Sequence, residues 1–359
     1  MALGLFWATT CLCILLFVLA LDIMGVFSRK NHFDVDGRTV VITGGSQGMG
    51  RGLAKLLASK GANIVIVARN KQKLEEALKY ISSAAKNPQA QRFHSISADV
   101  TKTEESERII SEVTAWNNGN APDIVWANAG SAHPGLFVDT PPETIRSQMD
   151  INYFAAAYLA HATLKTWIKP SPNTTSNANP KLVKPRHFVM TSSTLSFFSI
   201  VGYGPYSSPK AAMRSLADTL RSEVNLYNGA RRKDPINGPS ADIKIHCVMP
   251  GTITSPGFQH EESLKHEATK ILEKDDPKQT EDEVAKAAIN GLEKGGFIIT
   301  TQLLGHAMRA SALGGSARNN WFVDTIFSWV VAIAWLFIGP DLEGKVFDYG
   351  KKHGLAAPK

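Results

Sequence analysis

Short runs of β-branched and other apolar residues alternate along the chain with longer stretches in which apolar residues recur every three or four positions. These runs lie at 39–43, 64–68, 94–100, 124–128, 187–191, 243–248 and 297–300. The runs predict buried strands, and the periodic stretches predict helices that cross from one strand to the next. Such crossovers join parallel strands. We therefore predict an α/β fold, a doubly wound Rossmann fold with a seven-stranded parallel sheet.

Two polar segments interrupt the alternation. Residues 171–184 are rich in Pro, Asn and Ser, and residues 228–242 combine Gly and Pro with a basic cluster. Turn-forming residues at this density favour surface loops. We predict that both segments are insertions on one domain, which extends over residues 34–300.

The N-terminal end is continuously apolar. Residues 2–21 carry no charge, and twenty helical residues at about 1.5 Å each match the roughly 30 Å of a bilayer core. A cleaved signal peptide is the alternative, but no basic residue precedes the run and no clear small-residue cleavage site follows it. Because Arg29 and Lys30 follow the run, the positive-inside rule places the next domain in the cytosol. We predict a membrane anchor over residues 1–27.

A second apolar run, residues 321–338, has Asp324 as its only charged residue. Its tryptophans are typical of side chains at the headgroup level of a membrane. The run is compatible with a spanning helix, a re-entrant or interfacial hairpin, an amphipathic surface helix, or a buried C-terminal helix. We predict that residues 301–359 form an apolar membrane-associated region.

Composition excludes several other classes of protein. The chain has 39 Lys and Arg against 32 Asp and Glu, a formal charge of +7, without a long basic block. We therefore predict no nucleic-acid partner. The three cysteines, Cys11, Cys13 and Cys247, give neither a disulfide framework nor a zinc spacing, and the histidines show no ligand spacing. We predict no metal site.

A glycine-rich turn separates the first predicted strand from a predicted helix at 51–59. The turn contains Gly44, Ser46, Gln47, Gly48 and Gly50. Glycines let the backbone approach a pyrophosphate, and a helix N-terminus presents free N–H groups to it. This order predicts a dinucleotide site. The same residues also match the nucleophile elbow of hydrolases, with Ser46 as nucleophile, but an elbow this close to the first strand would be misplaced.

The ends of the next three predicted strands carry further candidate cofactor contacts. Arg69 ends the second strand, where an NAD site usually places an acidic residue, and Lys73 follows it. Cations suit a 2′-phosphate, so the pair predicts NADP(H). Asp99 and Val100 end the third strand, where Asp can hydrogen-bond the adenine. Asn128 ends the fourth strand, beside the predicted cofactor.

Candidate acid–base chemistry lies in Ser193, Tyr206 and Lys210. A tyrosine has an ordinary pKa near 10, which a neighbouring cation lowers. Four residues separate Tyr206 from Lys210, so the two side chains share one face of a helix. Because Pro209 is tolerated only in a first helical turn, we predict that this helix begins near Ser207. An ordinary amphipathic surface pair is the alternative interpretation of this spacing.

Together, the glycine turn, the Asn-Ala-Gly at 128–130, Asn152, Ser193 and the Tyr-x-x-x-Lys at 206–210 resemble the short-chain dehydrogenase/reductase family over residues 37–300. The resemblance implies that Tyr206 protonates the substrate carbonyl and that Ser193 polarises it. It implies that Lys210 lowers the pKa of the tyrosine and contacts the nicotinamide ribose, and that Asn152 positions a water relay. It also implies a homodimer.

The loop after the sixth predicted strand also resembles the family. It contains Pro250, Gly251, Ile253 and Thr254. The resemblance implies that this loop holds the nicotinamide amide. An Ala at position 127, where many members carry a second Asn, is one departure from the family pattern.

Residues 43–46, 67–70, 150–153 and 254–258 resemble an endoplasmic-reticulum branch of the family that reduces a sphingoid ketone. This resemblance implies NADPH-dependent reduction of 3-ketodihydrosphingosine to dihydrosphingosine at the cytosolic face of the membrane. The apolar residues at 197–201 lie where a lipid tail would pass, or they are ordinary loop packing.

Three alternatives stay open. One is a membrane-anchored reductase of another lipid ketone, such as a steroid or a very-long-chain 3-ketoacyl-CoA, for which the basic residues 231–233 would supply a patch. Another is a membrane-tethered NADPH-binding scaffold without catalysis. The third is the hydrolase.

Overall fold

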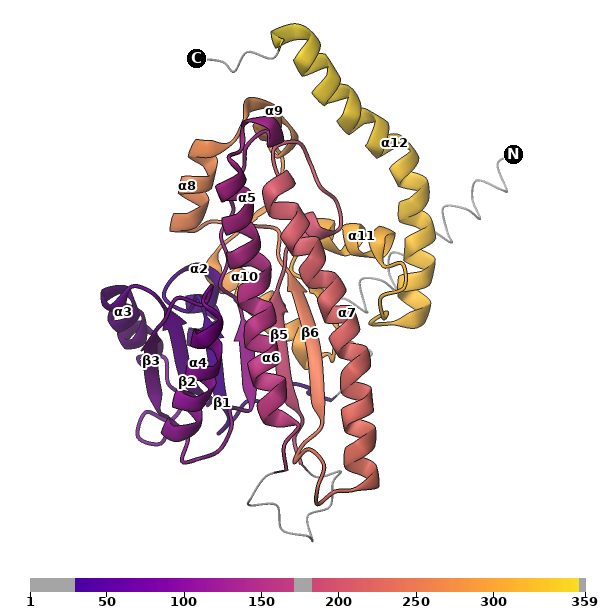
Figure 1. The fold of residues 1–359 in the computed structure, drawn as a ribbon. Coiled ribbons are helices and arrows are strands. Elements are labelled where there is room, and N and C mark those ends of the chain that lie inside the picture. The colour runs from indigo at the N-terminus through magenta and orange to yellow at the C-terminus, as the bar shows by residue number, and fades with distance from the viewer. Residues whose placement is uncertain (1–29, 171–182, 355–359) are drawn as a thin grey trace.

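A seven-stranded parallel sheet forms the centre of the molecule (Figure 1). The computed structural model describes residues 30–170 and 183–354, so the predicted anchor and most of the segment 171–184 lie outside the described residues. The strands are β1 (Thr39–Thr43), β2 (Asn63–Ala68), β3 (Phe93–Ser97), β4 (Ile124–Ala127), β5 (Arg186–Thr191), β6 (Ile243–Met249) and β9 (Ile298–Thr300). All seven predicted strands are confirmed.

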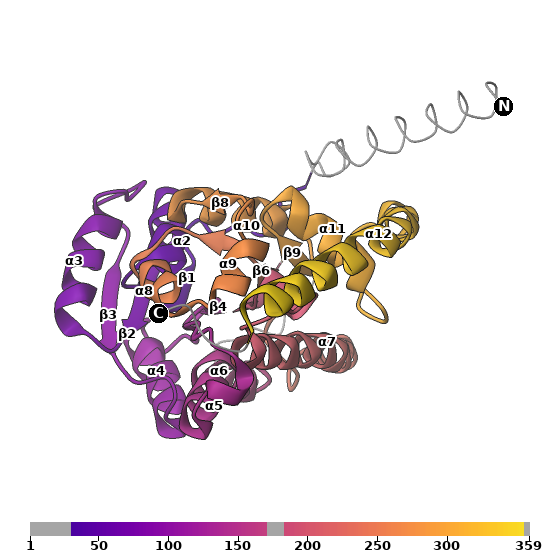
Figure 2. The same ribbon diagram turned by 90° about the horizontal axis from the view of Figure 1, so that it is seen from above.

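Helices cover both faces of the sheet (Figure 2). Apolar side chains of α4 (Thr103–Trp116), α6 (Ala155–Trp167) and α7 (Gly204–Lys233) share one core cluster with the sheet. Those of α2 (Gly48–Ser59), α3 (Lys71–Ser82) and α10 (Glu281–Glu293) share the other. Because both faces are covered, all strands except the edge strand β3 are buried along most of their length, which explains their largely apolar runs.

The order of the strands locates the site. The sheet runs β3-β2-β1-β4-β5-β6-β9, so the chain moves outward in one direction from β1 and in the other from β4. Val40 of β1 lies opposite Ile124 of β4 in the register. In a doubly wound sheet, ligands bind outside the carboxyl ends of the strands at this reversal. The glycine turn directly follows β1 at this point.

The start of α7 differs from the prediction. The helix begins at Gly204 rather than near Ser207, with Pro205 in its first turn. In the first turn of a helix, backbone N–H groups have no partner within the helix. A proline there loses no helical hydrogen bond, so it is well suited to begin a helix. Pro209 therefore lies in the second turn, where its missing N–H leaves the carbonyl of Pro205 without that helical bond.

The predicted insertion at 228–242 is partly wrong, because α7 continues to Lys233. Asp242 explains the added helical turns. Arg231 Nη1 lies 3.1 Å from Asp242 Oδ1, and Arg232 Nη2 donates to Asp242 Oδ2 over 2.6 Å. These ion pairs join the end of the helix to the residue before β6. The segment from residue 234 to residue 242 forms the loop.

The C-terminal part consists of two helices that pack together, α11 (Leu303–Ala312) and α12 (Trp321–His353). Since α12 is one continuous helix through the whole apolar run, a hairpin there is excluded. Arg309 of α11 and Asp324 of α12 form a buried ion pair with an Nη2–Oδ1 distance of 2.6 Å. Within the described residues, α12 has the length and composition of a membrane span. The remaining helices are α5 (Pro142–Met149), α8 (Pro256–Leu264) and α9 (Glu267–Leu272).

Candidate active site

A cavity of about 710 Å³ lies at the carboxyl ends of the strands, at the reversal between β1 and β4. Its wall includes most of the predicted cofactor residues: Gly44, Ser46, Gln47, Gly48, Arg69, Lys73, Asp99, Val100, Asn128, Pro250, Gly251 and Ile253. Ser193, Tyr206 and Lys210 line the same cavity. The structure therefore brings the predicted nucleotide and acid–base residues together in one space.

The glycine turn has the close backbone approach that a dinucleotide site needs. Gly44 has a φ of +67°, a conformation that favours glycine. A Cβ on Gly50 would lie 2.2 Å from the carbonyl oxygen of Gly44, so this position also requires glycine although it lies outside the cavity wall. Helix α2 begins at Gly48, and its first N–H groups point toward the cavity end of the sheet.

Two cations and a carboxylate line the outer part of the cavity. Lys73 Nζ donates to Gln47 Oε1 over 3.2 Å, and Arg69 lies beside it on the wall. Burial disfavours the charged form of Asp99, but hydrogen bonds from Thr101 and the charge of Arg69 lower the pKa of Asp99 overall. This part of the cavity has the charges that a phosphorylated ribose and an adenine amine would contact.

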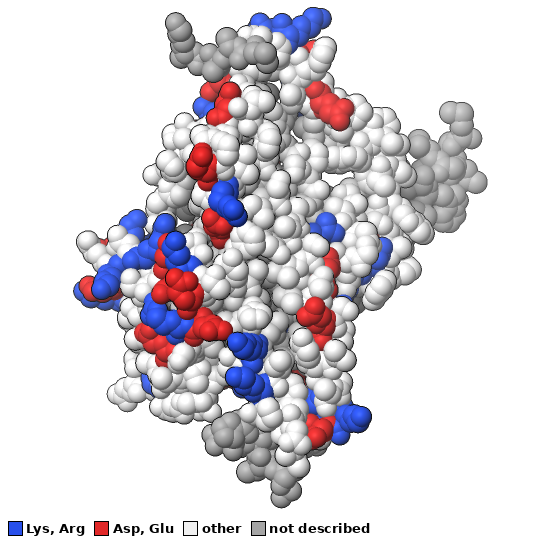
Figure 3. Space-filling model, in the orientation of Figure 1, with Lys and Arg blue, Asp and Glu red and all other residues white. Residues whose placement is uncertain are grey.

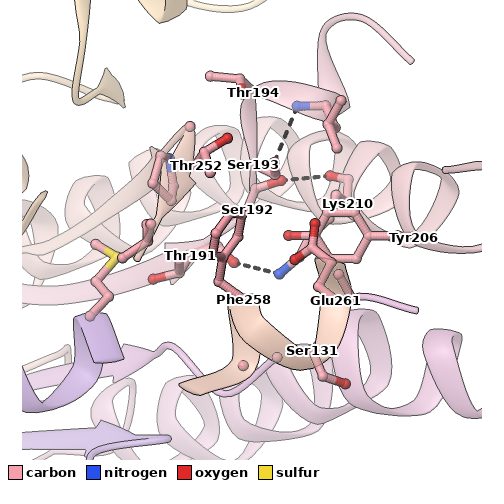
Figure 4. Close-up of a pocket in the computed structure, with 18 of the residues that line it drawn as sticks. Ser131, Thr191, Ser192, Ser193, Thr194, Tyr206, Lys210, Thr252, Phe258 and Glu261 are labelled. Carbon is pink, nitrogen blue, oxygen red and sulfur yellow. Dashed lines mark hydrogen bonds between the residues drawn. The ribbon is translucent and has the colours of Figure 1, made fainter. Parts of the chain in front are cut away.

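Ser193, Tyr206 and Lys210 lie at the inner part of the cavity (Figure 4). Lys210 is buried, its Nζ donates to the carbonyl oxygen of Thr191 over 3.0 Å, and it lies 5.6 Å from the centre of the Tyr206 ring. Ser192 Oγ donates to the Lys210 carbonyl over 2.8 Å, which holds α7 against the end of β5. The predicted helix face shared by Tyr206 and Lys210 is confirmed.

The pKa of Tyr206 differs from the expectation. Burial and the charge of Glu261 raise the pKa of the phenol, while a hydrogen bond with Ser193 opposes the shift. Burial also lowers the pKa of Lys210 to about 8. In this structure burial and the charge of Glu261 set the direction of the shift, and the lowering of the tyrosine pKa by Lys210 stays a prediction. Tyr206 is therefore protonated at neutral pH, the state that a proton donor needs.

Asn152 lies in a π-helical turn, Asp150–Phe154, and is fully buried. Its Oδ1 accepts from the backbone N–H of Ser131 over 3.2 Å, and its Nδ2 donates to the Ser131 carbonyl and to Gln148 Oε1 over 2.8 and 3.1 Å. Both N–H groups are thus used by the protein, and Asn152 lies outside the cavity wall. In this structure the amide fixes the loop after β4, and the water relay stays a prediction.

The loop after β6 closes the cavity. Thr194 N donates to the carbonyl of Pro250 over 3.0 Å, and β7 (Thr252–Ile253) pairs with β8 (Lys278–Gln279). A Cβ on Gly251 would lie 1.9 Å from Gln302 Nε2, so this glycine admits the Gln302 side chain. Thr254 lies outside the wall, since its hydroxyl donates to the Gln279 carbonyl over 3.2 Å.

Sequence reasoning missed two parts of the wall. One consists of polar residues, chiefly Tyr203, Glu261 and Glu273, for which no spacing gave a signal. The other is the apolar roof, formed by Leu304, Ala307 and Met308 of α11 and by Val331, Trp335, Ile338 and Leu342 of α12. The four α12 residues recur at helical spacing, and that repeat was a signal in the sequence. Phe198 packs edge-on against Trp335, with 4.8 Å between ring centres.

Comparison with known proteins identifies the family. A family model for short chain dehydrogenases matches residues 38–265. The chain belongs to the short-chain dehydrogenase/reductase family. This chain is therefore an oxidoreductase, and the resemblance read from the glycine turn, Ser193 and the Tyr-x-x-x-Lys spacing is confirmed.

Within the short-chain dehydrogenase/reductase family, the similar curated proteins include one from Aspergillus fumigatus. This 3-ketodihydrosphingosine reductase is 54% identical over 91% of this chain and 88% of its own length. A 3-ketodihydrosphingosine reductase of Neurospora crassa is 43% identical over 92% and 87%.

Among solved structures, a short-chain dehydrogenase/reductase of Burkholderia phymatum in complex with NAD has a TM-score of 0.58 at 18% identity. The match covers 79% of this chain and 92% of the Burkholderia phymatum chain. An alcohol dehydrogenase of Thermococcus sibiricus has a TM-score of 0.52 at 21% identity, over 74% and 95%. These two structures confirm the fold.

Proposed function

We propose that this oxidoreductase uses NADPH to reduce the 3-keto group of 3-ketodihydrosphingosine, giving dihydrosphingosine. The observation that carries the proposal is the shape of the cavity, which continues from Ser193, Tyr206 and Lys210 to the apolar roof of α11 and α12. A long-chain ketone needs a polar group for its carbonyl and an apolar wall for its tail. The names of the two similar fungal reductases support the same substrate.

The residues present fit NADPH. Gly44 and Gly50 let the turn after β1 pack tightly against its neighbours, and the N-terminus of α2, where a pyrophosphate would bind, follows directly. Arg69 and Lys73 would hold the 2′-phosphate, and Asp99 would accept from the adenine amine. NADPH, when bound, supplies the hydride. The loop that begins at Pro250 lines the same cavity, beside Thr194.

The reaction adds a hydride to C3 of the ketone and a proton to its oxygen. Ser193 is placed to donate a hydrogen bond to the carbonyl, which makes the carbon more electrophilic. Tyr206, which is protonated, breaks its O–H bond and gives the proton to the oxygen that becomes the alcohol. The buried Lys210 ammonium stabilises the phenolate that Tyr206 leaves behind.

The outer surface of α12 supports membrane contact. Trp329, Ile333, Leu336 and Phe337 are all exposed on the side opposite the roof residues. Figure 3 shows few charged side chains over the middle of this helix, whereas charges crowd over α3 and α4. We infer that this face of α12 contacts the bilayer of the endoplasmic reticulum, to which the predicted anchor would also tether the protein, with the reductase domain in the cytosol. The substrate would then enter from the lipid phase.

A cysteine substitution tests the membrane face of α12. We expect Phe337→Cys in microsomes to resist an aqueous maleimide and to react once detergent removes the bilayer, because lipid covers this side chain. Lys352→Cys, in the polar last turn of the same helix, is the control and should react in both conditions. Equal labelling of both variants in intact microsomes would refute the contact.

Arg69 is expected to determine the choice between NADPH and NADH. Because a hydrogen bond to a charged group contributes about 1.5–3 kcal/mol, Arg69→Ala should raise the KM for NADPH by about 10- to 150-fold. The KM for NADH, which has no 2′-phosphate, should change little. Lys71→Ala, on the exposed first turn of α3, is the matched control. Equal losses with both cofactors would exclude a 2′-phosphate contact.

The basic patch expected for a 3-ketoacyl-CoA substrate does not lie at the cavity. Arg231 and Arg232 are paired with Asp242 next to the start of β6, at the amino end of the sheet, whereas the cavity lies at the carboxyl end. No observation favours the scaffold or the hydrolase. A homodimer through α5, α6 and α7 stays a prediction from the family resemblance.

A parallel assay tests the substrate. Membranes that carry the protein should oxidise NADPH with 3-ketodihydrosphingosine and not with a long-chain 3-ketoacyl-CoA. Turnover of the CoA ester alone would leave the family assignment intact and overturn the proposed substrate.

A further inference from the structure

Carboxylates line the cavity on the side of Tyr206. Glu261 lies on α8, Glu273 directly follows α9, and Asp276 follows three residues later. The roof and much of the remaining inner wall are apolar, so these carboxylates are placed within the space that the substrate would enter.

Tyr203 positions Glu261 beside the acid–base residues. The hydroxyl of Tyr203 donates to Glu261 Oε1 and lies 3.5 Å from Glu273 Oε2. The ring of Tyr203 lies 6.0 Å from that of Tyr206, and Figure 4 shows Glu261 next to Tyr206. The rise in the pKa of Tyr206 caused by Glu261 is a second sign that the carboxylate is close to the phenol.

The charge around Glu261 is only partly balanced. Lys265 is buried, and its ammonium is shared by three carboxylates: it contacts Glu262 and lies 3.5 Å from Glu261 and 2.6 Å from Glu273. Asp276 adds a further carboxyl group, and burial raises the pKa of both Glu261 and Asp276. A cation that enters the cavity would therefore find carboxylates whose charge the protein compensates incompletely.

We propose that Glu261 binds the protonated 2-amino group of the ketone substrate and thereby selects an amino ketone over a neutral one. This inference rests on the proposed function. In such a substrate the amine is attached to the carbon next to the carbonyl, so a carbonyl at Tyr206 brings the ammonium toward Glu261. The ammonium forms a charge-assisted hydrogen bond with the carboxylate. The tail then leaves toward the roof of α11 and α12.

The same charges reject competing substrates. A neutral long-chain ketone gains nothing from the carboxylate and desolvates it further without adding a positive charge. A CoA ester would bring several phosphates toward Glu261, Glu273 and Asp276, which repel them. Specificity for the amino ketone therefore comes from one attractive contact and from repulsion of the alternatives.

Steady-state kinetics with two ketones test the role of Glu261. One ketone is 3-ketodihydrosphingosine, and the other has the same chain without the 2-amino group. We expect wild type to have a KM about 10- to 100-fold lower for the amino ketone. Glu261→Gln, which still accepts from Tyr203, should raise the KM for the amino ketone to the value for the other ketone. The KM for the other ketone should stay near its wild-type value.

Two further variants make the result specific. Glu262→Gln is the matched control, because Glu262 also contacts Lys265 but lies outside the cavity wall, so both KM values should stay at the wild-type level. Glu261→Asp keeps the charge and should restore part of the preference. Thermal unfolding of each variant reports whether the domain is intact.

The outcomes separate the inference from the proposed function. Failure of wild type to reduce either ketone would overturn the proposed function itself. Turnover of both ketones by wild type with equal KM would overturn the role of Glu261 alone, without reference to any variant. An equal KM increase for both ketones in Glu261→Gln would likewise contradict amine binding.

Discussion

Tyr206→Phe lowers the kcat for ketone reduction by about 10²- to 10⁴-fold, the range that a positioned proton donor contributes. The substitution removes one oxygen at the inner end of the cavity and leaves the ring packed against its neighbours. Because the glycine turn and Arg69 are untouched, the affinity for NADPH should stay near the wild-type value. NADPH oxidation and NADPH binding, measured on the same preparation, separate the two effects.

Tyr80→Phe is the control for this substitution. Tyr80 is an exposed tyrosine on α3 that receives a hydrogen bond from Lys55, and it lies outside the cavity wall. Removal of the Tyr80 hydroxyl should leave kcat for ketone reduction near the wild-type value. A Tyr206→Phe enzyme that keeps more than about a tenth of wild-type kcat would show that another group donates the proton.

Asp324→Ala should destabilise the protein by about 3–5 kcal/mol, because it leaves the Arg309 guanidinium buried without its carboxylate. Asp324 is 1% exposed, and it also accepts from the backbone N–H groups of Asn319 and Asn320. This residue therefore joins α11, the turn before α12, and α12 itself. Urea unfolding in detergent, followed by tryptophan fluorescence, gives the change in free energy.

Asp341→Ala is the matched control on the same helix. Asp341 pairs with Lys345 over 2.7 Å, but both side chains are at least half exposed, so the loss should be about 1 kcal/mol or less. Equal effects of Asp324→Ala and Asp341→Ala would mean that the buried pair does not hold α12 over the cavity.

Local patterns predicted most of the fold. Six of the seven strands are short, mostly buried runs, because helices cover both faces of the sheet, and this signal depends on a few consecutive residues; β3, at the edge, has only Ile96 buried. The glycine turn was equally readable, since Gly44 and Gly50 occupy positions where a side chain would strain or collide with the backbone. Helical spacing predicted that Tyr206 and Lys210 share one helix face, whereas their roles came only from the family resemblance.

Tertiary contacts explain what the sequence left out. Glu261 enters the site because Tyr203, 58 residues earlier in the chain, donates to it. Lys265 is four residues from Glu261, but that spacing alone does not place the pair beside Tyr206. The start of α7 was mispredicted because Pro205, and not Pro209, lies in the first turn of the helix. The pKa of Tyr206 could not be predicted either, because its shift comes from burial and from a carboxylate 55 residues away in the chain.

The most direct test of the account is hydride transfer from NADPH to C3 of the sphingoid ketone. Membranes carrying the protein would receive 3-ketodihydrosphingosine and NADPH with deuterium at C4 of the nicotinamide, on each face in turn. The account predicts that one of the two labelled cofactors yields dihydrosphingosine with a single deuterium at C3, and that Tyr206→Phe yields almost none. Unlabelled dihydrosphingosine with both cofactors, or no reduction of this ketone by wild type, would contradict it.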